Sequence, residues 1–419
     1  MTRKRSIIWT ICTLAILSLF VVRGPRRALT SSSDLRGPYT ASVVWLKGMN
    51  PYDSKQLTVT HVNQGGQGRL VQLLHPPGIL PLLAPLAIFQ WQTAKSVWLL
   101  VNLVSIGIII LSLLSITPKI AHQWGLLILG TLAFAPIHTA IQLGQLSLSA
   151  IAMGLSAFAL SGRNYRVIPA LLIALAVTLK PQIGLVFLAY LLATLRLKVF
   201  LLSLLASSCL LGVGIGGIVT SEIPLADIQT EWQRNLSESN SAKGGDRFTD
   251  ANPARSNLIN LHIFLSAFIS DQRVVSITVP IVVLVGCLIW LGLYHVRDRS
   301  APLAIALSLP LILSLQIVYH RTYDAIVLLL PLSWAISEWT GIYQKTARLI
   351  LITGAVFFVP GGALVAWAQT TDRLPLELTH HPVWKTLVVP HGSIALLVIS
   401  LILLIVMSRR NSSGQRGIE

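Results

Sequence analysis

The sequence predicts an all-α fold, a polytopic transmembrane helical bundle with about 12 spans and further helices at its outer face. Of its 419 residues, 53% are hydrophobic and only 11% are charged, and the mean hydropathy is +0.71. Soluble domains average about 25% charged residues. Apolar runs able to cross a hydrocarbon core of about 30 Å recur along the chain. We therefore expect a single integral membrane domain over residues 1–419.

Twelve apolar segments are the expected spans. They cover residues 7–22, 96–116, 122–138, 145–161, 165–179, 182–196, 199–219, 274–295, 301–318, 323–337, 346–368 and 389–407. The start, MTRKR before apolar residues, resembles a secretory signal, but no small-residue cleavage site follows, so we interpret it as an uncleaved first helix. Residues 79–90 and 257–270 are also apolar, and we expect them to dip into the membrane as re-entrant or interfacial helices.

The net charge of +17 is distributed as in an inserted membrane protein. With the N-terminus in the cytoplasm, 15 of the 32 Lys and Arg residues fall in the inner tails and loops, four fall in the short outer loops, and the others lie in the long outer segments. This bias is the positive-inside pattern of helical membrane proteins. We therefore attribute the excess charge to topology and expect membrane lipids as partners, with no nucleic acid.

Two long segments lie on the outer side in this topology, residues 23–95 and 221–273. The first contains a stretch from Pro38 to Lys47, followed by Gly48, that we interpret as an amphipathic helix along the membrane surface. The second is rich in Ser, Asn and Asp, and we expect a mobile loop there.

Unusual polar residues gather on the same outer face, each at or near the end of a predicted span. They are Asp34, His75-Pro76-Pro77, Gly144-Gln145, Lys180-Pro181-Gln182 and Tyr319-His320-Arg321-Thr322-Tyr323-Asp324. Any one of them has an ordinary explanation, because a Lys or Arg at a helix end commonly extends toward water. Their joint position opposite the basic rim predicts an active site at the membrane surface.

Several other patterns are excluded as sites. The glycines at 212–217 fit a dinucleotide-binding pattern, but they lie inside an apolar span without a preceding strand, so we interpret them as packing residues. The chain has no Asp-x-Asp pair and no clustered Cys and His residues, so we expect neither a metal nor another cofactor. The three cysteines, Cys12, Cys209 and Cys287, sit in apolar runs and are expected to be packing residues.

The polar motifs resemble those of one known family. They are Asp34 followed by Tyr39, NPYD at 50–53, HPPG at 75–78, GQLSL at 144–148, LKPQ at 179–182 and HRTYDAIVLLLP at 320–331. In this order they resemble glycosyltransferase family 87, whose members are polytopic GT-C enzymes similar to polyprenyl-phosphate-mannose-dependent mannosyltransferases. The resemblance implies a lipid-linked donor used outside the cytoplasm and an Asp base in the first outer loop, which is Asp34 here. The chain departs from the family at His75, where an aromatic residue is usual, and around His320.

The residues themselves are compatible with such a reaction. Lys180, Arg321 and His320 are expected to hold the donor phosphate, and Asp34 to remove the proton from the acceptor hydroxyl, with inversion at the sugar carbon. The predicted catalytic residue is therefore Asp34, and the predicted substrate-binding residues are His75, Gln145, Lys180, Gln182, His320, Arg321, Tyr323 and Asp324.

Some alternatives stay open at this stage. Asp53 competes with Asp34 for the role of base, although its position in NPYD favours a turn in which it caps the next helix. A secondary transporter or lipid-linked sugar flippase is the main alternative function, and a structural membrane subunit is another. We expect a multi-pass protein of the inner or plasma membrane, with a polyprenyl-phosphate sugar as donor and a glycolipid or glycan as acceptor. Mannose follows from the resemblance alone.

Overall fold

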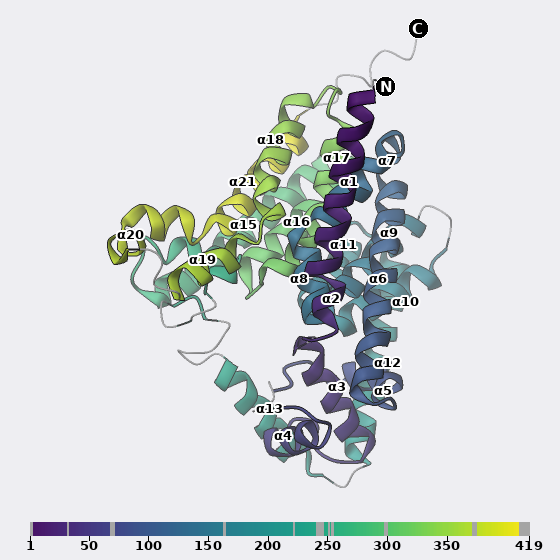
Figure 1. The fold of residues 1–419 in the computed structure, drawn as a ribbon. Helices are drawn as coiled ribbons and strands as arrows, with labels where there is room; N and C mark the ends of the chain where they lie inside the picture. The colour runs from purple at the N-terminus through teal and green to yellow at the C-terminus, as the bar shows by residue number, and fades with distance from the viewer. Residues whose placement is uncertain are drawn as a thin grey trace.

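The computed structural model describes residues 3–31, 33–67, 72–161, 165–220, 223–239, 247–249, 252, 255–296, 301–370 and 375–409. Within these residues the regular structure is helical, and the extended backbone forms only one isolated antiparallel bridge, between Leu258 and Arg321. The all-α prediction is therefore confirmed. Figure 1 shows α1 beginning at one end of the molecule, with α3, α4, α5 and α13 gathered at the opposite end.

The α-helices are listed here in chain order. They are α1 (Arg3–Arg23), α2 (Pro25–Ala28), α3 (Ser33–Leu46), α4 (Ser54–Asn63), α5 (Ile79–Ala87), α6 (Trp91–Ile116), α7 (Trp124–Ala133), α8 (Ala135–Leu143), α9 (Ser147–Leu160), α10 (Val167–Leu179), α11 (Pro181–Ala193), α12 (Leu197–Val219), α13 (Leu225–Ser239), α14 (Leu261–Leu265), α15 (Gln272–Val296), α16 (Leu303–Ile317), α17 (Leu329–Ser337), α18 (Gln344–Gly354), α19 (Gly361–Thr370), α20 (Leu376–His380) and α21 (His391–Ser408). Shorter helical turns are η1 (Pro118–Gln123), η3 (Arg255–Asn257), η4 (Thr322–Leu328), η5 (Ala355–Phe358) and η6 (Trp384–Val388).

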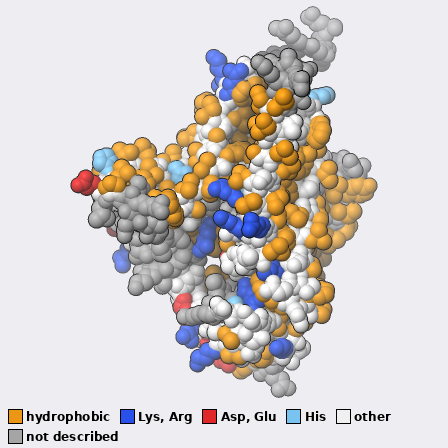
Figure 2. Space-filling view, in the orientation of Figure 1, with side chains coloured by type: hydrophobic (Ala, Val, Ile, Leu, Met, Phe, Trp, Pro, Cys, Tyr) orange, Lys and Arg blue, Asp and Glu red, His pale blue; other side chains and the backbone are white. Residues whose placement is uncertain are grey.

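Five helical segments of the described chain are long and apolar enough to cross a membrane. They are Ile7–Leu46, Trp91–Ile116, Leu197–Val219, Gln272–Val296 and His391–Ser408. Two bent pairs, Pro118–Ala133 with Ala135–Leu143 and Gln344–Phe358 with Gly361–Gln369, raise the number to seven if each pair is one span. Figure 2 shows apolar side chains over much of the visible face of these helices. The chain is thus a multi-pass membrane protein.

The remaining predicted spans correspond to five shorter apolar helices. These are Ser147–Leu160, Val167–Leu179, Pro181–Ala193, Leu303–Ile317 and Thr322–Ser337. At 1.5 Å per residue, helices of this length fall short of a hydrocarbon core of about 30 Å. They exist as helices where the hydropathy placed them, and the count of 12 crossings stays a prediction.

The helical body is held by close contacts between small residues. Helix α9 packs against α6 and α10, and Ser149 and Ser156 of α9 meet Ser105 and Ser112 of α6 at 3.0 and 3.2 Å between hydroxyl oxygens. Small side chains at such positions let two apolar helices approach closely without a charge between them. A rigid bundle therefore supports the loops at its ends.

Helix α3 differs from the amphipathic surface helix expected between Pro38 and Lys47. It begins at Ser33, and every side chain from Leu35 to Val44 is buried. Because α3 lies against both α4 and α5, neither face lies along the molecular surface as in an amphipathic surface helix. Pro38 lies inside the helix, where its missing N–H removes one bond close to the first turn. The predicted stop is confirmed, because Gly48 adopts a left-handed φ of 68° just after Leu46.

The two short apolar stretches do not have the length of a span. Helix α5, in the 79–90 stretch, has nine residues and packs against α3, α12 and α6, while α14, in the 257–270 stretch, has five. Nine residues rise by only about 14 Å as an α-helix. Neither stretch therefore crosses a bilayer as a helix, and the expected dips into the membrane stay a prediction.

The NPYD motif forms a capped turn. The Asp53 carboxylate accepts hydrogen bonds from the backbone N–H groups of Lys55 and Gln56 at the start of α4, at 2.8 and 3.3 Å. Asn50 Oδ1 accepts from the backbone of Tyr52 at 2.9 Å. Both interactions are those expected of a turn and an N-cap. The interpretation of Asp53 as a helix cap is confirmed.

The second outer segment is partly helical, which corrects the expected mobile loop for α13. The helix packs on the NPYD turn: Asn235 Nδ2 donates to the Tyr52 carbonyl at 2.9 Å, and the rings of Trp232 and Tyr52 lie 5.9 Å apart. The cause is an amphipathic pattern of apolar residues along 225–239. Residues 240–246, 250–251 and 253–254, which carry most of the polar run, lie outside the described residues.

The glycines of α12 are confirmed as packing residues at two positions. A Cβ at Gly214 would lie 2.2 Å from the Pro77 carbonyl oxygen, and one at Gly217 would lie 2.4 Å from the Trp45 ring. Trp45 Nε1 also donates to the Gly214 carbonyl at 3.2 Å. Helix α12 therefore touches the HPPG loop directly, and this contact fixes where His75 lies.

Gly214→Ala is expected to lower the free energy of unfolding by about 1–3 kcal/mol, because the added methyl overlaps a backbone carbonyl. Gly216 is the matched control on the same helix, since nothing lies within 4 Å of a Cβ there. Gly216→Ala should stabilise by up to about 1 kcal/mol through helix propensity. Denaturant unfolding in mixed micelles measures both variants, and equal shifts would contradict the packing role of Gly214.

Candidate active site

A buried charged cluster lies where three distant segments meet. Asp324 is its centre: His320 Nδ1 lies 2.8 Å from Asp324 Oδ2, and Ser147 Oγ donates to Asp324 Oδ1 at 2.5 Å. Lys180 Nζ is 3.6 Å from the same Oδ1 and 5.2 Å from the Tyr323 ring centroid. The exposed fractions are 0% for His320, 1% for Asp324 and 7% for Lys180. Buried charges are tolerated when paired in this way.

Local breaks in the helices deliver these side chains. Lys180 lies between α10 and α11, where Pro181 begins the second helix and Lys180 itself leaves helical geometry. Gln145 follows the end of α8 at Gly144, whose φ of 67° is left-handed. The extended residues before η4 are fixed when Ile259 N–H donates to the His320 carbonyl at 3.0 Å.

Asp34 joins this cluster through the loop that follows α8. It lies in the first turn of α3, and the Gln145 side-chain amide donates to its Oδ2. Ser33 Oγ donates to Oδ1 at 3.1 Å. The Asp34 carboxylate also interacts electrostatically with Tyr323. Since Ser147 binds Asp324 two residues after Gln145, the loop after α8 links Asp34 to the charged cluster.

His75 also faces the cluster. Burial and the nearby Lys180 ammonium lower the pKa of His75 to about 4, so this imidazole is neutral at pH 7. Its backbone is held in place by Tyr52, whose hydroxyl donates to the His75 carbonyl at 2.8 Å. His75 therefore contributes a neutral side chain, and Lys180 carries the positive charge on this side.

The depressed pKa makes stability depend on pH. The folded protein resists protonation of His75 while the unfolded chain binds the proton near pH 6.5, so stability should fall as pH drops from about 6.5 to 4. In His75→Gln this contribution disappears. As the pH falls through this window, the melting temperature of the wild type should drop further than that of the variant. Above pH 7 the difference between the two melting temperatures should be constant. Parallel melting curves from pH 4 to 7.5 would contradict this assignment.

Two further predicted site residues are Gln182 and Arg321. Gln182 is partly buried in the first turn of α11. Arg321 pairs its backbone with Leu258, and its guanidinium carbon lies 6.0 Å from the Tyr319 ring centroid. Its charge also acts on Tyr323, as the Asp34 carboxylate does. The structure thus gathers Asp34, His75, Gln145, Lys180, His320, Arg321, Tyr323 and Asp324, and Gln182 follows Lys180 by two residues.

The carboxylate of Asp324 changes the expected role of Lys180. Sequence alone assigned Lys180 to a phosphate, but the two buried charges already compensate each other. His320 keeps one free edge, because its Nε2 atom is buried and has no hydrogen-bond partner in the described part of the chain. Such an orphan atom is suited to a hydroxyl group of a bound molecule.

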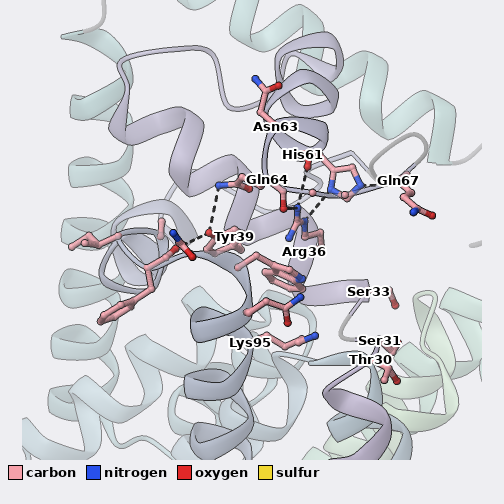
Figure 3. A pocket seen from close by; sticks show the side chains of 18 residues that line it. Thr30, Ser31, Ser33, Arg36, Tyr39, His61, Asn63, Gln64, Gln67 and Lys95 are labelled. Atoms are coloured by element: carbon pink, nitrogen blue, oxygen red, sulfur yellow. Dashed lines mark hydrogen bonds between the residues drawn. The ribbon is translucent and has the colours of Figure 1, made fainter.

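A cavity of about 990 Å³, lined in part by Ser33, the residue before Asp34, was not predicted from the sequence. Its polar wall includes Ser33, Arg36, His61, Gln64 and Lys95, contributed by α3, α4 and the start of α6 (Figure 3). The sequence did contain one sign of a cationic cavity. No acidic residue occurs between Asp53 and Glu222, so Lys95 has no acid near it in the sequence to compensate its charge. The described residues contain no group of three or more His, Cys, Asp or Glu side chains able to hold a metal ion.

Comparisons with known proteins bear on this site. A model of glycosyltransferase family 87 matches residues 73–317, more than half of the chain. The match includes His75, Gln145, Lys180 and Gln182, whereas Asp34 and residues 320–324 lie outside it. Neither the curated proteins nor the solved structures gave a match. The chain belongs to glycosyltransferase family 87 and is a multi-pass membrane glycosyltransferase.

Proposed function

We propose that the protein transfers a hexose from a polyprenyl-phosphate-linked donor to a hydroxyl group of a glycolipid or glycan on the extracytoplasmic face. Mannose is the hexose that we propose first. The observation that carries this proposal is the continuous polar cluster from Asp34 through Gln145 and Ser147 to Asp324, Lys180 and His320. This cluster supports a single reaction centre to which residues near 34, 145, 180 and 320 all contribute.

Asp34 acts as the general base in this proposal. Its carboxylate takes the proton from the acceptor hydroxyl as that oxygen attacks the anomeric carbon. The bond from this carbon to the phosphate oxygen breaks, and polyprenyl phosphate leaves on the opposite side, so the configuration inverts. Gln145 donates to one carboxylate oxygen and holds the base in orientation. A positioned base of this kind contributes about 10²- to 10⁴-fold to the rate.

The buried cluster binds the sugar. The unpartnered Nε2 atom of His320 is a hydrogen-bonding site for a sugar hydroxyl, and Asp324 fixes the imidazole by holding Nδ1. Lys180 and the neutral His75 line the same side, with Gln182, Arg321 and Tyr323 around them. Polar groups whose geometry is already fixed recognise hydroxyl groups at low entropic cost.

The test is direct. Purified protein in liposomes is supplied with a labelled polyprenyl-phosphate hexose and a glycolipid acceptor, and the product is analysed for transfer and for anomeric configuration. Transfer with inversion is expected. Passage of the unchanged donor across the bilayer, without transfer to any acceptor, would instead favour a flippase.

A further inference from the structure

The cavity beside α3 contains two buried cations and no acid. The side chains of Arg36 and Lys95 are each 5% exposed, and neither contacts a carboxylate in the described part of the chain. Lys180 differs, because Asp324 compensates its charge. Because a buried charge without a counter-ion is costly, these two cations favour an anion in the cavity.

Arg36 is held with part of its guanidinium group unused. Its Nε atom donates to His61 Nδ1 at 2.9 Å, and one terminal nitrogen donates to the carbonyls of His61 and Gln64 at 3.1 and 3.2 Å. The other terminal nitrogen is buried and has no partner among the described residues. The Trp91 ring centroid lies 4.4 Å from the guanidinium carbon and fixes its plane. Two N–H groups of Arg36 are thus left for a ligand.

The start of α6 supplies further donors. Lys95 Nζ donates to the Leu29 carbonyl and has two more protons to give. Gln90, Trp91 and Gln92 line the cavity, and Gln90 caps α6 without a side-chain hydrogen bond. The start of this 26-residue helix, with the positive end of its dipole, therefore lies in the cavity wall. This donor set matches a phosphate.

The edge of the cavity is apolar and lies where α6 begins. Ile88 and Phe89 line it and are 78% and 47% exposed. Since α6 is long and apolar enough to span the membrane, this edge lies at a membrane boundary in the proposed topology. Cationic walls beside an apolar edge suit an anionic group attached to a lipid chain.

We propose that Arg36 and Lys95 bind the phosphate group of the polyprenyl-phosphate donor. The inference rests on the proposed function, and it moves the phosphate from Lys180, where the sequence suggested it, to the cavity. Ser33 connects the two parts: it lines the cavity, and its hydroxyl binds the Asp34 carboxylate.

Binding of polyprenyl phosphate without a sugar tests this site independently of transfer. Lys95→Gln is the main variant, because it removes the charge and keeps a side-chain N–H donor. Arg36→Gln is the second. Losing one charged hydrogen bond weakens binding about tenfold to 150-fold. The matched control is Lys55→Gln, an exposed cation on α4 outside the cavity lining, which should bind as the wild type does.

Dissociation constants are measured by native mass spectrometry for polyprenyl phosphate, phosphatidylglycerol and inorganic phosphate. A selective loss of polyprenyl-phosphate binding in Lys95→Gln and Arg36→Gln supports the site, and in transfer assays Lys95→Gln should raise the donor KM more than it lowers kcat. Unchanged binding in both variants overturns the site and leaves the Asp34 mechanism standing. Loss of phosphatidylglycerol binding alone overturns it in favour of a membrane-lipid contact. A wild type that does not bind polyprenyl phosphate overturns the donor class as well.

Discussion

Replacing Asp34 with Asn is expected to lower kcat for sugar transfer by about 10²- to 10⁴-fold, the range of general-base contributions. The amide has the size of the carboxylate, so α3 and the loop after α8 keep their arrangement, but it does not take a proton from a hydroxyl group. The donor KM should change little, because Arg36 and Lys95 remain in place. Steady-state kinetics with a labelled polyprenyl-phosphate sugar gives both constants.

Asp53→Asn is the control for this experiment. Asn and Asp are comparable N-cap residues, so the side-chain oxygen still accepts from the N–H groups of Lys55 and Gln56. Activity and melting temperature should both stay at the wild-type values. If Asp34→Asn retained wild-type turnover, Asp34 would not be the base, and loss of activity in Asp53→Asn alone would assign that role to Asp53.

The fold was predictable where long apolar runs decide it. Predicted spans 199–219 and 274–295 agree with α12 (Leu197–Val219) and α15 (Gln272–Val296) to within two residues at most ends. Span 122–138 is instead broken at Phe134, where the two halves bend by 51°. Pro136 in the first turn of α8 marks this break, but hydropathy does not register a missing N–H.

Helix α3 shows why local pattern alone was insufficient. Pro38 favoured a helix start, and Tyr39, Val43 and Leu46 on one face favoured an amphipathic helix. The helix instead starts at Ser33 and is buried by segments distant in the sequence, as in the bond from Tyr39 to the Phe89 carbonyl at 2.8 Å. The local pattern describes how this helix would behave alone at a membrane surface, whereas in the folded protein tertiary packing buries both of its faces.

The candidate site divides in the same way. Gly144-Gln145 and Lys180-Pro181 were found because residues that end or start helices are visible in sequence. The bond between Ser147 and Asp324 joins residues 177 positions apart, and no local rule predicts it. Arg36 was missed because its neighbours, His61 and Trp91, become neighbours only when α4 and α6 fold against α3.

Asp324→Asn is expected to lower the free energy of unfolding by about 3–5 kcal/mol, the cost of leaving one buried partner of an ion pair uncompensated. Lys180 would keep its charge in a site where it is 7% exposed and the neutral amide offers no compensation. Lys180→Met should cost less, because Asp324 keeps its contacts with His320 and Ser147. Unfolding by denaturant in mixed micelles measures both variants.

The double variant, Lys180→Met with Asp324→Asn, separates folding from function. Because it removes both charges, it should be more stable than Asp324→Asn alone, and the excess over additivity measures the coupling between the two residues. It should nevertheless stay inactive, since the sugar would have lost both Lys180 and the carboxylate that fixes His320. Additive costs would show that the two charges do not compensate each other in the folded protein. Recovered activity in the double variant would show that this pair serves the fold alone, and the sugar site would then have to be sought elsewhere around Asp34.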